Sequence, residues 1–228
     1  MIKIKTSFFS SLFCFTLLLA GCGAHDPRRL PEAPHVFPME TLAVFGFLPG
    51  PFSPEEGGTV RSPLTGSVFS RGPVPEGVSG QLTARLQERL SGELSAELLS
   101  PEVARKAFWT VRERAYTGDD LEILRKTGES LETDAILAGY IFRWQERVGS
   151  DYSVSRPASA AFELVLIRSA DGGILWKGRF DKTQTSLTED LLDLRTFLKS
   201  KGRWMSVADL GDIGLSDLSE QIPVAKKE

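Results

Sequence analysis

The residue types that most often perform covalent chemistry or hold metals are confined to the start of this chain. Its two cysteines are Cys14 and Cys22, and its two histidines are His25 and His35. Everything after His35 therefore lacks a thiol nucleophile, a disulfide and a histidine for a Ser-His-Asp relay. It also lacks the cysteine and histidine ligands of the usual zinc sites. We expect no metal and no cofactor in the part of the chain that folds.

Cys22 ends a segment with the composition of a secretory signal. A basic start is followed by an apolar run over residues 8–19, shorter than the roughly 20 residues that cross a bilayer. Leu19-Ala20-Gly21-Cys22 resembles the bacterial lipobox, which implies cleavage between Gly21 and Cys22 and a lipid, including palmitate, on Cys22. Two or three acyl chains anchor durably, because each buried CH2 contributes about 0.8 kcal/mol. An ordinary secretory signal with an incidental cysteine is the alternative.

The predicted domain boundaries follow from this signal. Residues 1–21 are the signal peptide, and residues 22–39 are the lipidated cysteine and a proline-rich flexible tether without chemistry. Residues 40–223 form a single α/β domain, and residues 224–228 are a polar tail. Gly23 stands where an aspartate would imply retention in the inner membrane of enteric bacteria. By that resemblance the chain belongs to the outer membrane, on its periplasmic side.

Carboxylates are the remaining groups that could perform acid–base chemistry. A glycoside hydrolase needs two of them about 5 to 9 Å apart. Glu163 and Asp181 alternate with apolar residues on predicted strands, so we expect both to be solvated. No pair stands out from the acidic residues of the second half, which include Glu146, Asp151, Glu163, Asp181 and Glu189. A glycan-cleaving enzyme is therefore an alternative and not the leading interpretation.

A recognition segment is predicted at the tip of a long hairpin, over residues 145–159. It gathers residue types that dominate the energy of protein interfaces, Tyr and Arg above all: Glu146, Arg147, Asp151, Tyr152 and Arg156. The alternative is a solvated tip with a local ion pair of little energetic value. Arg203 and Trp204, between two predicted helices, form a second candidate.

Charge argues against one class of partner. The chain carries 27 Lys and Arg against 30 Asp and Glu, a net charge of −3, and has no basic run. Proteins that bind nucleic acid present a basic patch or stripe. We therefore expect no nucleic-acid partner.

The first half of the domain is predicted from apolar runs and periods. Residues 41–49 form a buried strand, and residues 51–77 form a long loop rich in glycine and proline. From Val78, leucines at every fourth position predict an amphipathic helix. A short strand over residues 96–99 follows, and then come a helix from Pro101, capped by Ser100, and a helix from Asp119 or Asp120 to Leu131.

The second half is predicted to be an antiparallel meander. Two alternating runs flank Asp171-Gly172 and form a hairpin, which pairs with a strand over residues 134–148. Helices open at Ser186 and Ser206, and Trp176 and Phe180 lie in the core. One face of the strand over residues 134–148 carries Ile136, Ala138, Tyr140, Phe142 and Trp144. The predicted class is α/β, with a mixed sheet, a C-terminal three-stranded antiparallel meander and helices packed on it.

Several segments resemble one group of envelope proteins. "LAVFGFLP", "TDAILAGYIFRW" and "ADGGILWKGRF" are similar to lipoproteins that share the α/β module of the amino-terminal domain of the Tol-system propeller protein. The group includes lipoprotein activators of penicillin-binding proteins and the curli-secretion lipoprotein. The resemblance implies the fold, the envelope location and a non-catalytic role in assembly. This chain has no surplus amphipathic strands for a pore, and no binding residue carries over.

We therefore predict an outer-membrane lipoprotein, anchored through its lipid, that binds an unidentified envelope protein during cell-envelope or peptidoglycan assembly. An accessory lipoprotein of an export or lipid-transport complex is one alternative, and the glycan-cleaving enzyme is the other. The sequence does not fix an oligomeric state.

Overall fold

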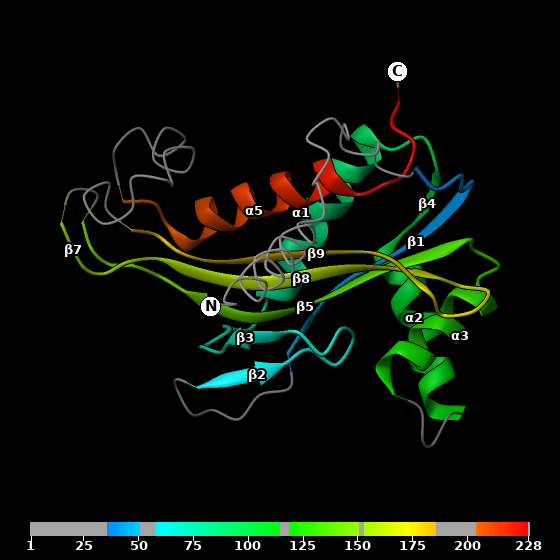
Figure 1. Ribbon diagram of the computed structural model, residues 1–228, viewed down its shortest axis with the longest axis horizontal. Helices are drawn as coiled ribbons and strands as arrows, with labels where there is room; N and C mark the ends of the chain where they lie inside the picture. Colours follow the sequence, from blue (N-terminus) through cyan, green and yellow to red (C-terminus); the bar gives the residue numbers. More distant parts are fainter. Residues whose placement is uncertain (1–35, 51–57, 115–118, 151–152, 186–203, 228) are drawn as a thin grey trace, which may run out of the picture. The chain divides into compact units, whose positions relative to one another are not determined.

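A five-stranded mixed sheet organises the chain in the computed structural model, which describes residues 36–50, 58–114, 119–150, 153–185 and 204–227 (Figure 1). In spatial order its strands are β4 (Glu97–Leu99), β1 (Thr41–Pro49), β5 (Ala135–Gln145), β8 (Ser159–Arg168) and β9 (Ile174–Thr183). β1 runs parallel to both of its neighbours, β4 and β5, whereas β8 runs antiparallel to both β5 and β9. The predicted α/β class with a mixed sheet is confirmed.

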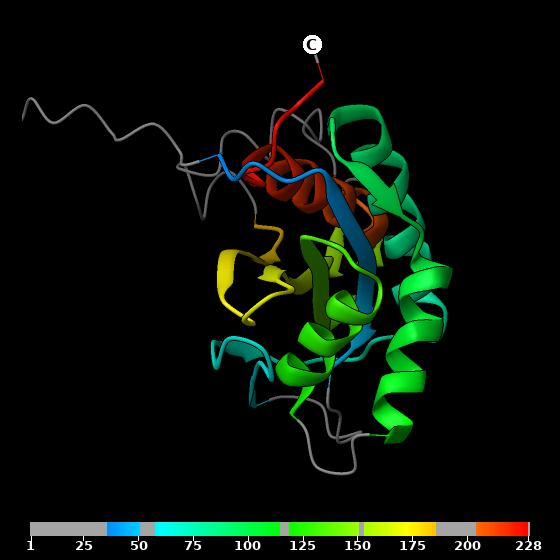
Figure 2. The same cartoon turned by 90° about the vertical axis from the view of Figure 1, so that its right-hand side faces the viewer.

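Helices cover both faces of this sheet. They are α1 (Val78–Glu93), α2 (Pro101–Arg114), α3 (Asp120–Ser130) and α5 (Val207–Gln221). α1 and α5 pack on one face through apolar residues such as Leu86 and Leu215, and α2 and α3 pack on the other through Phe108 and Leu124. Figure 2 shows α5 and α3 on opposite sides of the strands. Because both faces are covered, β5 is buried along almost its whole length.

Local signals explain where the helices begin. Of the five leucines predicted to form a stripe, Leu82, Leu86 and Leu90 are buried on α1. The helix ends at Glu93, so Leu94 is its C-cap and Leu98 lies on β4. Asp119 caps α3 by accepting from the backbone N–H of Glu122 at 2.8 Å. Ser206 and Asp209 form a capping box at the start of α5. The helix predicted from Ser186, like the signal sequence and Cys22, lies outside the described residues.

The prediction of a long loop over residues 51–77 is wrong for the described part of this range, which contains a second small sheet. β2 (Thr59–Arg61) and β3 (Val68–Ser70) pair antiparallel. Phe69 turns inward from β3 and stacks on Phe142 of β5, with ring centroids 4.1 Å apart. Three-residue strands between glycines and prolines leave no period in the sequence, although Phe69 supplies the apolar contact that fastens them.

Trp144 lies on the opposite face of β5 from the one predicted, because β5 contains a bulge. The β5–β8 register shifts between Ile141 and Arg143, so the alternation slips by one residue there. Phe142 lies on the face of α2 and α3, but Trp144 lies on the face of α1 and α5. The meander itself extends beyond the sheet as a second ribbon, β6 (Val148–Gly149) paired with β7 (Val154–Arg156).

The ends of the described body are joined. Phe37 forms a parallel bridge with Val224, and Leu94 forms an antiparallel bridge with Lys226. Val224 is only 3% exposed and belongs to the core on the α1–α5 face. The segment predicted as a polar tail over residues 224–228 therefore begins with a packed strap, because alternation places valine inward and its neighbours outward.

Candidate functional site

The residues predicted to bind a partner divide into two groups. Glu146, Arg147, Arg156 and Trp204 belong to the described part of the chain, whereas Asp151, Tyr152 and Arg203, the lipidation pair Gly21 and Cys22, and the acid Glu189 lie outside it. The described members come from the two candidate segments of the sequence analysis.

Glu146 and Arg147 bring these two segments together. The carboxylate of Glu146 accepts from the backbone N–H of Val207, 3.3 Å from each oxygen, and so places negative charge at the N-terminus of α5. Arg147 donates to the backbone carbonyl of Trp204. Both side chains therefore fasten the hairpin to the start of α5, a structural role that the sequence did not reveal.

Arg156 ends β7 and lines an open pocket of about 380 Å³ at the base of the hairpin. It is exposed and forms no ion pair with any described residue. Its register partner on β6 is Val148, a residue that is 45% exposed. The other lining residues are Ser70, Arg71, Arg143, Gln145, Pro157, Ser159, Asp181 and Thr183.

We call this pocket at the base of the hairpin the basic pocket. Its wall is built around Arg143, a residue that was not predicted to be functional. Arg143 is 7% exposed and donates to Ser159 Oγ at 2.6 Å, to the carbonyl of Ser70 at 2.7 Å and to Asp181 Oδ1 at 2.7 Å. A Cβ on Gly72 would lie 2.6 Å from Cγ of Arg143, so only glycine lets the chain pass so close. A charged residue within an apolar strand was the signal that could have found it.

Asp181 is shared between two arginines. Its second oxygen accepts from Arg179 at 2.7 Å, and the guanidinium of Arg179 also lies 4.3 Å above the ring of Phe69. Asp181 is half-buried by these contacts. The expectation that it is simply solvated is therefore wrong.

Glu163 departs further from that expectation. It is 2% exposed, because the turn between β2 and β3 closes over it. Ser62 Oγ donates to one carboxylate oxygen, and Thr65 Oγ1 donates to the other at 2.9 Å. Burial raises the pKa of Glu163, while the two hydroxyl donors act in the opposite direction. Neither Glu163 nor Asp181 is placed as an exposed acid or base.

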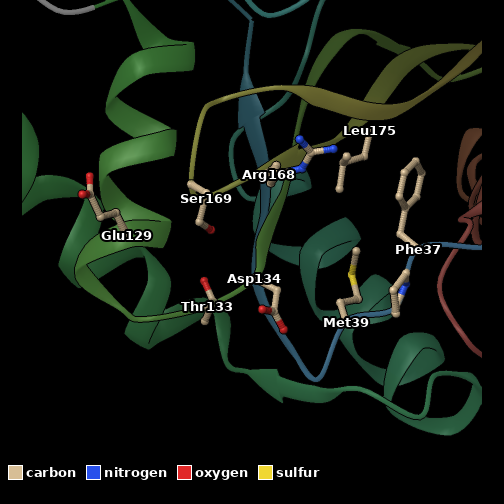
Figure 3. Close-up of a pocket in the computed structure, with 10 residues that line it drawn as sticks. Phe37, Met39, Glu129, Thr133, Asp134, Arg168, Ser169 and Leu175 are labelled. Atoms are coloured by element: carbon tan, nitrogen blue, oxygen red, sulfur yellow. The ribbon is translucent and has the colours of Figure 1, made fainter.

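A second pocket, of about 470 Å³, lies where β1 and β5 begin (Figure 3). Phe37, Met39 and Leu175 supply an apolar side, and Ser169 and Thr133 face it from the other. The hydroxyl of Ser169 has no hydrogen-bond partner among the described residues. The pocket therefore combines an apolar side with a buried hydroxyl.

Asp134 at the rim of this second pocket is committed to the fold. One of its oxygens accepts from the backbone N–H groups of Thr41 at 3.0 Å and Glu40 at 2.8 Å. These donors, Thr41 first, lower the pKa of Asp134. The carboxylate therefore ties the start of β1 to the start of β5.

Comparisons with known proteins give structural similarity only. No family model and no curated protein matches the chain. It is similar to the PelC dodecamer from Paraburkholderia phytofirmans, at 10% identity and a TM-score of 0.43 over 82% of this chain and 89% of that one. It is also similar to the LpoB C-terminal domain from Salmonella enterica, at 13% identity and a TM-score of 0.37 over 64% and 83%. Lipoprotein GNA1162 from Neisseria meningitidis matches at 14% identity and a TM-score of 0.37 over 70% and 91%. Similarities of this size carry no functional argument.

The described side chains suit one kind of binding. They form no cluster of three or more His, Cys, Asp or Glu able to hold a metal ion. Among the described helices, none combines the length and the apolarity that membrane crossing requires. The hairpin base offers the fixed guanidinium of Arg143 beside the exposed Arg156, which suits charge-assisted hydrogen bonds to an anion.

Proposed function

We propose that this chain is a lipoprotein, anchored in the outer membrane through Cys22 and facing the periplasm, that binds an envelope protein during cell-envelope or peptidoglycan assembly. The observation that carries the proposal is Leu19-Ala20-Gly21-Cys22 at the end of a short apolar run. Gly23 supports the outer membrane as the destination. We also propose that the domain is related to the α/β module of the Tol-system propeller protein, which its sequence motifs resemble.

A binding role is preferred to catalysis because of how the acids are used. A general acid or base must come within hydrogen-bond reach of its substrate. Glu163 is buried beneath the β2–β3 turn, Asp181 is held by two arginines, and Glu146 accepts from the start of α5. Each of these acids would have to leave its present contacts before it could act on a glycan.

The anchor is tested first, by following processing in a Gram-negative host. The full chain should incorporate radioactive palmitate, and its processing should stop in the presence of globomycin. Cys22→Ser should abolish both the label and the cleavage, whereas Cys14→Ser, a matched change within the signal, should alter neither. A mature protein that carries no lipid, or that begins at a residue other than Cys22, would contradict the proposal.

The partner is tested next, by crosslinking intact envelopes and identifying what copurifies with the lipidated chain. Peptidoglycan synthases among the adducts would support the assembly role. Transporter subunits would instead support the accessory-lipoprotein alternative. A muropeptide-cleaving activity that survives purification, and that Asp181→Asn removes without unfolding the chain, would support the enzyme.

A further inference from the structure

We propose that the basic pocket at the hairpin base receives the carboxylate side chains of an acidic, partly apolar segment of the partner protein. This inference rests on the proposed function, because it names the chemistry of that partner. Its starting point is the pocket of about 380 Å³ bordered by β3, β5, β7, β8 and β9.

The charge of this pocket is opposite to that of the chain as a whole. Among its described lining residues, Arg143 and Arg156 stand against one acid, Asp181. That acid already accepts from Arg143 and Arg179, so it does not offset Arg156. In a chain with a net charge of −3, this local excess of positive charge selects an anionic group.

The pocket is also preorganised. Arg143 is more than nine-tenths buried and held by three hydrogen bonds, all between 2.6 and 2.7 Å. Its guanidinium therefore loses little conformational freedom when an anion arrives. Arg156, exposed on β7, is the residue that can close on the ligand, and a guanidinium binds a carboxylate through two parallel hydrogen bonds.

The rim favours a protein segment over a free phosphate or a bare glycan. Val148 is 45% exposed and lies opposite Arg156 across the β6–β7 ribbon, and Pro157 lines the pocket itself. Apolar side chains next to arginine are typical of the well-desolvated centres of protein interfaces. An acidic segment with apolar residues next to its acids therefore matches both parts of the surface.

A direct binding measurement tests this chemistry. The probe is a fluorescent six-residue peptide of alternating glutamate and leucine, titrated with the full lipidated chain in detergent. Arg156→Glu should raise the Kd about tenfold or more, the size of one charge-assisted contact. Arg114→Glu makes the same change of charge at an exposed position of α2 and should leave the Kd unchanged. Arg156→Lys should fall between wild type and Arg156→Glu, because it keeps the charge but loses the fork.

Two results of the titration would overturn the inference. Equal weakening by Arg156→Glu and Arg114→Glu would mean that the peptide senses only overall charge. Displacement of the peptide by inorganic phosphate or by muropeptides at lower concentrations than an unlabelled peptide would assign the pocket to another anion. Thermal melts of both variants must match wild type, which the exposure of both side chains leads us to expect.

Crosslinking in cells separates this inference from the proposed function. A photo-reactive residue at Val148 should yield a protein adduct that disappears when Arg156→Glu is added. The same residue at Trp109, which is 53% exposed on α2, samples another surface. Adducts from position 109 alone, or from neither position, would contradict the pocket. The proposed function would instead fail if the crosslinked envelopes described above yielded no envelope protein with the lipidated chain.

Discussion

Arginine side chains in this chain differ in how much of their hydrogen-bonding capacity the fold uses. Arg143 is buried with three partners, Arg179 is shared between Asp181 and the ring of Phe69, and Arg156 has no ion pair within the described residues. A buried guanidinium stabilises the fold only while its partners remain, because a lone buried charge is costly. The first two are thus parts of the structure, and the third is available to a ligand.

Replacing Arg143 should expose this difference. Arg143→Met removes the donor to the carbonyl of Ser70, one of the hydrogen bonds of Ser159 Oγ and one of the two arginines of Asp181. We expect the free energy of unfolding to fall by about 3 kcal/mol, as for other broken buried pairs. Urea denaturation measures it, with Arg114→Met as the exposed control, expected within about 0.5 kcal/mol of wild type. A similar loss in both variants would mean that Arg143 is not specially placed.

Glu163 should make stability depend on pH. Burial raises its pKa above the ordinary 4.5, so the folded chain holds this proton more tightly than the unfolded chain does. The stability that this proton contributes is fully present below the ordinary pKa and is lost as the pH rises through the raised value. Unfolding free energies of wild type and Glu163→Gln should therefore diverge as the pH rises above the ordinary pKa of 4.5, with wild type losing more.

The slope of that difference with pH, and not its offset, is the quantity to compare, because the amide also changes the contacts with Ser62 and Thr65. Glu113→Gln, at an exposed position of α2, is the matched control. Parallel curves for wild type and Glu163→Gln would show that the burial of this carboxyl has no effect on its protonation.

At the scale of elements, a strong apolar period was enough to predict a helix or strand and its ends, and a weak period was not. β1 and α3 begin and end where the sequence predicts, within a residue. The sequence of the β2–β3 hairpin has no apolar period, so the hairpin was not predicted. Because this hairpin covers Glu163, the prediction that Glu163 is solvated was wrong as well. Trp144 was predicted on the wrong face because the bulge arises from the pairing of β5 with β8. The sequence of one strand does not show how it pairs with another.

The candidate site was predictable only in part, for a related reason. Glu146, Arg147 and Arg156 stood out as interface residue types. Glu146 and Arg147 have a structural role because they contact Val207 and Trp204, which lie about 60 residues later in the chain. No local pattern encodes such contacts, and the same is true of the bond between Arg143 and Asp181.

The junction of β1 and α1 offers a test at this scale. Gly46 has φ +80°, at the bulge between β1 and β5, and a Cβ there would lie 2.3 Å from Thr83. Thr83 Oγ1 in turn accepts from the backbone N–H of Phe47 at 2.9 Å. Gly46→Ala must therefore both strain the backbone and displace Thr83, and it should cost about 3 kcal/mol.

Gly66 separates the two causes. Its φ is +70°, but nothing lies within 4 Å of a Cβ built there. Gly66→Ala should therefore cost only about 1 kcal/mol, the strain alone. Urea midpoints of the two variants compare the effects directly, and equal losses would refute the close approach of Thr83.

At the scale of the whole described body, the segment that leads toward Cys22 is clasped by the other end of the chain. The backbone N–H of Phe37 donates to the carbonyl of Pro223 at 2.9 Å, and Val224 packs beneath this bridge. Lys227 donates to the carbonyl of Glu93 at 2.8 Å at the end of α1. A pull transmitted from the proposed lipid anchor would thus reach the strap at Val224 as well as β1.

Val224→Asp should break this clasp, because it places an unpaired carboxylate at a position that is 3% exposed. We expect a loss of about 3 kcal/mol, or a fall in Tm of roughly 6 to 12 °C for a body of this size. Residues 36–40 should also become sensitive to protease while the rest of the chain stays folded at moderate temperature. Ala225→Asp, the exposed neighbour, should change neither quantity. If Val224→Asp melts like wild type, or if both variants are cleaved alike, the strap does not hold residues 36–40, and β1 alone would bear the load from the proposed anchor.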